Sequence, residues 1–221
     1  MYFFGGIMKR NLYIYPILSA LVFFILLYAG NYGPTKPSEA ATDTTTLTTT
    51  VLQYISFSLT SGDTVPFGDL TPGTPIPAPS SGTIASVTTN AANGYTIGLH
   101  DGESGSNSSM THTDDTVTKI TDFTLGNITT PVVWGAGTGV GITLFAADTS
   151  KEEKWGTGTT YDDSNNKYAA VPETATTAHT VTGFREGADT SYWAWKIDVP
   201  NTQKTGAYSG TVTFTATAVL S

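Results

Sequence analysis

Cysteine is absent from this chain of 221 residues. No disulfide bond can therefore stabilise the fold, and stability has to come from buried apolar surface, a bound metal or assembly with other chains. Basic residues are also scarce, with 10 Lys and Arg against 18 Asp and Glu. Because phosphate binding requires a concentrated basic surface, we expect no nucleic-acid partner. Helical periodicity over three turns is lacking after residue 29, which leaves strands and turns as the main elements.

A hydrophobic run near the N-terminus has the pattern of a secretory signal peptide. Lys9 and Arg10 precede the apolar residues 13–29, as the charged region of such a leader does. We predict a signal peptide over residues 1–30, with Met8 as an alternative start and cleavage between about residues 29 and 40. An uncleaved membrane anchor is the alternative, although glycines and prolines end any helix after residue 29. The expected product is secreted, extracellular or at the cell surface, and meets the membrane only through its leader.

The exported part of the chain is acidic. All 18 acidic residues follow Pro37, and loss of Lys9 and Arg10 leaves a formal charge of about −10. Such a charge favours binding of cations or solubility through an acidic surface. The length that remains is sufficient for one sizeable core.

A threonine-rich segment follows the leader and predicts an N-terminal arm over residues 31–50. It has strong β propensity but almost no apolar residue to anchor it in its own domain. We predict that part of it is a strand donated to another subunit; these residues are Thr42, Asp43, Thr44, Thr45, Thr46, Leu47, Thr48, Thr49 and Thr50. The alternative is a disordered linker, which threonine-rich arms often are.

Residues 51–221 are predicted to form a single all-β domain, a β-sandwich of Greek-key or jelly-roll type. Short strands recur at nearly regular spacing between turns rich in glycine, proline and asparagine. The expected strands span residues 52–59, 82–89, 95–100, 117–124, 139–145, 168–171, 177–182, 192–199 and 209–220.

Tryptophans divide into two groups. Trp193 and Trp195 share one face of a strand with Ile197 and Val199, which predicts core packing more strongly than a sugar-binding platform. Trp134 and Trp155 lie beside glycines, and we expect them to be exposed in loops.

Catalytic motifs are missing, and we expect no enzyme. The three histidines have no paired spacing and no nucleophile motif beside them. His112 and Asp114 could supply metal ligands, but an exposed loop histidine is the simpler interpretation. Adjacent carboxylates in a strand point to opposite faces, so the acidic pairs do not specify a glycosidase.

Acidic turns suggest a hard cation. Oxygen-rich turns of this kind suit Ca²⁺, which accepts six to eight flexible oxygen ligands, although no EF-hand spacing is present. Solvated acidic turns are the alternative. The candidate ligands are Asp101, Glu103, Asp114, Asp115, Asp162 and Asp163. Asn107 and Asn127 match the N-glycosylation acceptor pattern.

Several segments of the chain together carry a resemblance to known proteins. They are the leader, the threonine-rich arm and residues 51–59, 66–73, 90–97 and 208–218. In these segments the chain resembles secreted β-sandwich filament subunits. It is similar to the cannula proteins of hyperthermophilic archaea and, more distantly, to TasA-like biofilm-fibre and archaeal pilus subunits.

The resemblance implies a structural subunit that polymerises by donor-strand complementation, with Ca²⁺ at subunit contacts. Its partners would be copies of itself in a helical homopolymer, and related subunits. Such a mechanism is physically reasonable because an unpaired sheet edge invites pairing. One alternative is a surface-anchored adhesin or carbohydrate-binding module that uses Trp134, Trp155, Tyr161 and Tyr168. Another is a component of an S-layer or sheath.

Overall fold

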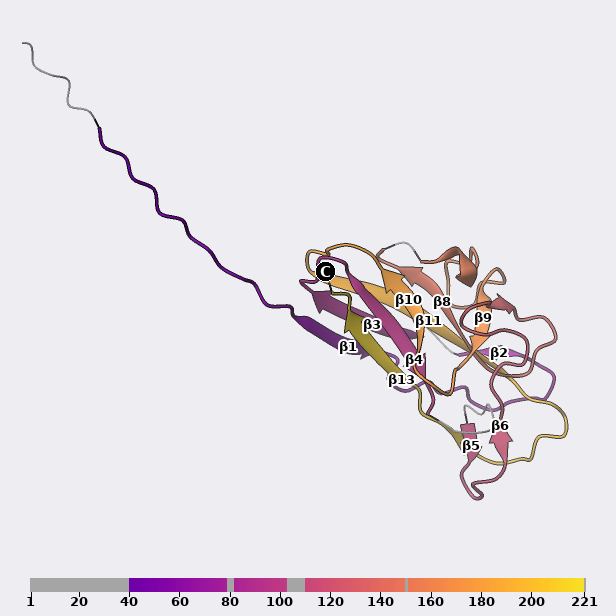
Figure 1. Cartoon of the computed structure of the whole chain (residues 1–221). Coiled ribbons are helices and arrows are strands. Elements are labelled where there is room, and N and C mark those ends of the chain that lie inside the picture. The colour runs from indigo at the N-terminus through magenta and orange to yellow at the C-terminus, as the bar shows by residue number, and fades with distance from the viewer. Residues whose placement is uncertain (1–39, 79–81, 103–109, 150, 221) are drawn as a thin grey trace, which may run out of the picture. The chain divides into compact units, whose positions relative to one another are not determined.

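The structure is a computed structural model that describes residues 40–78, 82–102, 110–149 and 151–220. The described part consists of antiparallel strands and one short 3-10 turn, and it forms an all-β sandwich (Figure 1). The predicted fold class is therefore confirmed. The predicted signal peptide lies outside the described residues.

Thirteen strands and one 3-10 turn make up the described elements. They are β1 (Ile55–Ser61), β2 (Ile76–Pro77), β3 (Thr83–Thr89), β4 (Tyr95–His100), β5 (Met110–His112), β6 (Lys119–Ile120), β7 (Val132–Val133), β8 (Gly139–Ala147), η1 (Glu153–Trp155), β9 (Lys167–Ala170), β10 (Thr176–Val181), β11 (Ala188–Asp198), β12 (Tyr208–Ser209) and β13 (Thr213–Ala218).

The strands form three sheets. The largest has the order β1-β3-β11-β8-β9-β7, with β2 paired to β11. A second sheet has the order β10-β4-β13, and a small third sheet has the order β12-β5-β6. Most neighbours are far apart in the sequence: β3 pairs with β11, and β4 pairs with β13. The chain therefore crosses between the first two sheets, as it does in the short connections from β3 to β4 and from β10 to β11.

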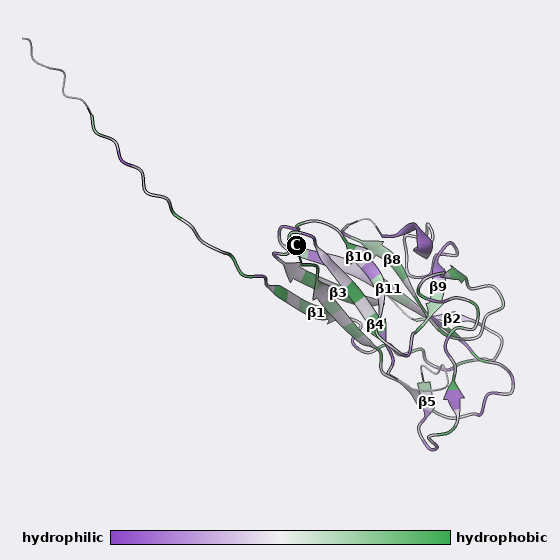
Figure 2. Cartoon of the chain, in the orientation of Figure 1, coloured by the Kyte–Doolittle hydropathy of each residue, from purple (hydrophilic) through white to green (hydrophobic). Residues whose placement is uncertain are grey.

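The core lies between the two larger sheets. Strand alternation directs Trp193, Trp195 and Ile197 of β11 inward, where all three are buried. The ring of Trp193 meets that of Phe214 on β13 edge to face at 5.6 Å, which joins the two layers. Figure 2 shows the same alternation of apolar and polar residues along β1.

The predicted bounds of the longer strands agree with the structure, whereas those predicted in the middle of the chain do not. Residues 95–100 match β4 at both ends. The strand expected over residues 117–124 is wrong, because only Lys119–Ile120 pairs with β5 and Asp122 makes a single bridge to Val140. The strand expected over residues 209–220 is divided between β12 and β13.

The chain divides into two compact units, residues 1–50 and 51–221. In the N-terminal unit, residues 40–50 have no regular secondary structure and are exposed. The domain begins at Val51. Within the described ranges, no helix has the length and apolar character needed to cross a membrane.

Candidate functional site

The core is incompletely covered where β1 and β13 meet. These strands belong to different sheets but lie side by side (Figure 1). Apolar side chains that pack against the core but stay partly exposed come from β1, the loop after it, β5 and the chain from β12 to β13. They are Ile55, Phe57, Leu59, Val65, Phe67, Leu70, Met110, Tyr208, Val212, Phe214 and Ala216. The core of the described domain is therefore least covered on this side.

The edges of β1 and β13 have no strand partner on this side. Among the described residues, β1 pairs only with β3 and β13 pairs only with β4. Each outer edge therefore presents backbone N–H and C=O groups that an additional strand could bond. The outer edge of β10 differs, because the N–H of Thr180 donates to Oε1 of Glu152 at 2.7 Å. Strand addition is thus favoured at β1 and β13.

Two adjoining cavities lie beside these edges. The first, of about 380 Å³, is lined by residues that include Leu59, Trp195 and Phe214. The second, of about 810 Å³, extends to Ile120 and Ile197. We call the two cavities together the trough, because they share four lining residues: Val65, Phe67, Met110 and Tyr208.

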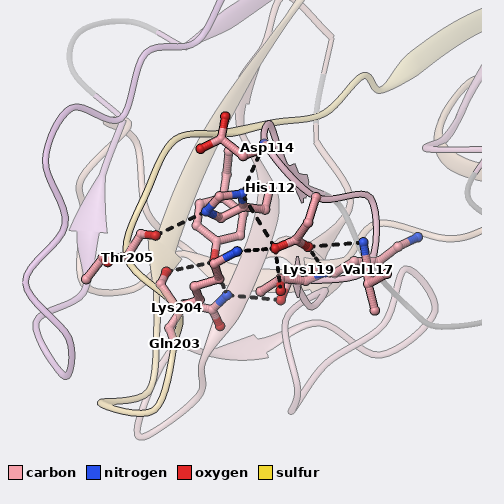
Figure 3. A network of polar contacts seen from close by, with 10 residues as sticks. His112, Asp114, Val117, Lys119, Gln203, Lys204 and Thr205 are labelled. Carbon is pink, nitrogen blue, oxygen red and sulfur yellow. Dashed lines mark hydrogen bonds and ion pairs between the residues drawn. The ribbon is translucent and has the colours of Figure 1, made fainter.

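A polar network holds one wall of the trough in place (Figure 3). The amide of Gln203 donates to the hydroxyl of Tyr208 at 2.7 Å and to the carbonyl of Lys119 at 3.2 Å. The Tyr208 hydroxyl in turn donates to the carbonyl of Lys204 at 2.7 Å. The Lys204 ammonium pairs with Asp115. These bonds attach residues 203–208 to β5 and β6, so the network shapes the trough.

His112 belongs to this network, and its expected exposure is wrong. Its side chain is buried, and its ring meets that of Tyr208 edge to face at 5.0 Å. The Nδ1 atom accepts the backbone N–H of Asp114 at 3.1 Å, and Nε2 lies 3.1 Å from the carbonyl of Thr205. The tautomer with the proton on Nε2 satisfies both contacts. Because both ring nitrogens have protein partners, His112 is a structural residue here.

Asp115 also has partners within the protein. Besides Lys204, its oxygens accept hydrogen bonds from the backbone N–H of Val117 and from both the N–H and the hydroxyl of Thr118. The Lys204 contact, followed by the Thr118 bond, holds the pKa of this carboxyl well below its usual range. The adjacent Asp114 is exposed.

The acidic turn at residues 161–167 is closed by the same kind of bonding. Asp163 accepts the backbone N–H of Asn165 at 2.9 Å and that of Thr159 at 3.2 Å, and these bonds lower its pKa. Asp162 is exposed and accepts the hydroxyl of Thr160 at 3.0 Å. This turn is therefore ordered by its own donors.

The described candidate calcium ligands are not gathered into one site. No group of three or more metal-ligating side chains is found within the described ranges. Asp101 is partly exposed at the end of β4 and donates its backbone N–H to Pro172. Glu103 lies outside the described residues, as does Asn107.

The aromatic residues expected to be exposed are mostly buried, which corrects the sequence interpretation. Trp134 is 4% exposed, stacks on Phe123 at 4.4 Å and meets Tyr168 edge to face at 5.3 Å. The Lys196 ammonium lies 5.4 Å from the centre of the Trp134 ring, and burial lowers the pKa of that lysine. Trp155 is fully buried. These rings are part of the core and present no binding platform.

A second buried histidine joins η1 to β10. His179 is fully buried, and its Nδ1 lies 2.8 Å from Oε2 of Glu152. Burial raises the pKa of Glu152, but the hydrogen bond with His179 and the backbone bond from Thr180 outweigh burial, so the pKa is lowered. The pair fastens the Glu152 segment to the outer edge of β10.

Asn127 lies on an exposed turn. Its Oδ1 accepts the N–H groups of Thr129 and Thr130, each at 2.9 Å. These turn-closing bonds use the side-chain oxygen of Asn127, and the side-chain nitrogen, where glycosylation would occur, takes no part in them.

Comparison with known proteins does not assign the chain to a family. No protein-family model matches it, and no curated protein matches it.

The trough was not predicted from the sequence. Its one signal is that Val65, Phe67 and Leu70 are apolar residues within a turn rich in proline and glycine.

Proposed function

We propose that this protein is the structural subunit of an extracellular filament or tube, and that its subunits join by donor-strand complementation. The proposal rests on two features that occur in the same chain. The core of the domain is incompletely covered, and the segment before β1 has apolar side chains that are not buried. The core is least covered at β1 and β13. Leu47 and Val51 are 90% and 80% exposed. Both surfaces would be covered if each subunit supplied a strand to the next.

Repetition of this contact would produce a polymer. The donating segment and the accepting side are different surfaces, so the contact between subunits is heterologous. A heterologous contact that does not close into a ring repeats as a helix. Filaments, tubes and sheath-like lattices differ only in the geometry of that repeat.

Calcium at subunit contacts is part of the proposal. Subunits with a charge of about −10 repel one another when they are packed side by side. Exposed carboxylates such as those of Asp114 and Asp162 are available to meet a neighbouring subunit. A cation shared between subunits would reduce the repulsion, because Ca²⁺ accepts carboxylate and carbonyl oxygens from several segments.

An adhesin or carbohydrate-binding module has less support. It would need exposed aromatic rings, and the described structure buries Trp134, Trp155 and Tyr168. Tyr161, the remaining candidate, is partly exposed.

The direct test compares the exported protein with a variant that lacks residues 38–50. Electron microscopy, with and without Ca²⁺, should show helical polymers of the intact protein and none of the variant. Circular dichroism and thermal melting should show that the variant folds, because the deleted residues contribute little to their own core. Polymers of normal appearance from the variant would refute the role of the arm. An intact protein that stays monomeric at all concentrations would refute the filament.

A further inference from the structure

We propose that the segment from Leu47 to Val51 of a second copy binds along the free edge of β13, with Leu47 and Val51 facing the trough. It would add a fourth strand to the β10-β4-β13 sheet. This inference rests on the proposed function, and it names the accepting edge and the residues inserted.

The donated segment has a suitable pattern. Leu47 and Val51 are four residues apart, so in a strand they share one face, about 13 Å apart. Thr46, Thr48 and Thr50 would then lie on the opposite face. The segment therefore offers the trough a face made of Leu47, Thr49 and Val51, and it offers solvent a face made only of threonines.

β13 has the matching pattern. Phe214 and Ala216 face the core and are partly exposed, while Thr213, Thr215 and Thr217 are exposed on the other face. A donated strand would place its threonines beside these, and threonine pairs across strands are favourable. On β1 the equivalent face carries Ser56, Ser58 and Thr60, and threonine is a favoured strand residue whereas serine is not. These patterns favour β13 over β1.

A second copy is the favoured source because the residues that directly follow the segment, Leu52 and Tyr54, are bonded in line with β1. The backbone N–H of Tyr54 donates to Oδ1 of Asn90 at 2.6 Å, and the Asn90 amide donates to the carbonyl of Leu52 at 2.8 Å. The backbone N–H of Asn90 also donates to the Tyr54 carbonyl at 3.3 Å. These bonds extend the β1–β3 pairing, in which Ile55 opposes Thr89.

Folding back onto β13 would require a reversal between Val51 and Ile55. That stretch contains no glycine, proline, asparagine or aspartate. These are the residues that tight turns prefer. A same-chain insertion is therefore disfavoured by the sequence and by the bonds to Asn90.

Disulfide trapping tests the inference cleanly, because the chain has no cysteine of its own. A donor variant, Thr48→Cys, would be mixed with one acceptor variant at a time under polymer-forming conditions and oxidised. The β13 acceptors are Thr213→Cys, Thr215→Cys and Thr217→Cys. Ser58→Cys tests β1, and Thr180→Cys on the capped β10 edge is the matched control. Directly opposite residues in neighbouring strands are close enough for a disulfide.

We expect a covalent heterodimer with at least one β13 acceptor and none with Ser58→Cys or Thr180→Cys. Leu47→Asp, added to the donor, should abolish that product, whereas Thr46→Asp should leave it. Cross-linking to Ser58→Cys alone would overturn the choice of β13. If polymers form but cross-link to no acceptor, β13 is not the accepting edge, and the proposal of a filament is unaffected.

The remaining outcomes concern the source of the strand. In the double variant Thr48→Cys with the best β13 acceptor, a disulfide that forms within one chain at high dilution would overturn the second copy as donor. A wild-type protein that never polymerises, together with no heterodimer, would overturn both this inference and the proposed function.

Discussion

Replacing Phe214 with alanine should cost less stability than replacing a phenylalanine whose side chain is buried. Phe214 lines the trough and is partly exposed, so the space left by its ring opens to water. Only the transfer free energy is then lost, about 1.5–2.5 kcal/mol. Phe123 provides the matched control: it is 3% exposed and stacks on Trp134. Phe123→Ala should cost about 3–5 kcal/mol, because a cavity is added to the transfer loss.

The assay is urea unfolding of each variant under conditions that keep the protein monomeric, followed by intrinsic fluorescence. A midpoint shift for Phe214→Ala clearly smaller than that for Phe123→Ala supports an incompletely covered core. Under polymer-forming conditions, Phe214→Ala should also reduce polymer yield, because its ring would contact the donated strand. Equal losses for the two variants in the monomer would refute the reasoning, since Phe214 would then be as well covered as Phe123.

Three further predictions concern charge, the arm and the cation. The lowered pKa of Glu152 means that its contribution to stability is present above its unfolded pKa of about 4.5 and is lost as pH falls through the folded value. Glu152→Gln should therefore lower the urea midpoint at pH 7 and reduce the decline of that midpoint in acid. Glu153→Gln, at an exposed position, should do neither. Identical plots of urea midpoint against pH for the two variants would contradict this prediction. Leu47→Asp should prevent polymerisation while leaving the monomer's melting temperature unchanged, and Thr46→Asp should polymerise normally. Ca²⁺ should raise polymer yield and melting temperature, and chelation should reverse both; unchanged values with no calorimetric uptake would refute the cation.

The sequence predicted those strands whose pattern is visible in their own residues and in the turns beside them. The turns on either side identified β4, and period-two alternation identified the inward face of β11, since alternation follows from strand geometry alone. The all-β class followed from the strands and turns together. Short pairings such as β7, with two residues, have no period to detect.

The wrong predictions concern side chains whose burial is determined by residues distant in the sequence. Trp134 lies beside a glycine and was expected in an exposed loop. The structure packs it over Gly141, where an added Cβ atom would lie 2.8 Å from the ring. His112 is buried because residues 203–208 fold over it, and a Cβ atom at Gly206 would lie 2.2 Å from its Nε2. Neither contact has a signal in the neighbouring sequence.

The trough could not be predicted for the same reason. Alternation indicates that Phe57 and Phe214 face inward, but it does not indicate how completely the other sheet covers them. That coverage depends on which strands form the edges, and so on the order of the strands. The prediction of an N-terminal arm, by contrast, needs only local information, namely the threonines and the lack of apolar anchors.

Helical reconstruction of the polymer by electron cryomicroscopy tests the central claim most directly. The account predicts that residues 42–51 of each subunit form a strand beside β13 of its neighbour, with Leu47 and Val51 directed into the trough. A polymer in which these residues lie away from any sheet edge would contradict donor-strand complementation. A protein that remains monomeric under every condition would contradict the filament itself.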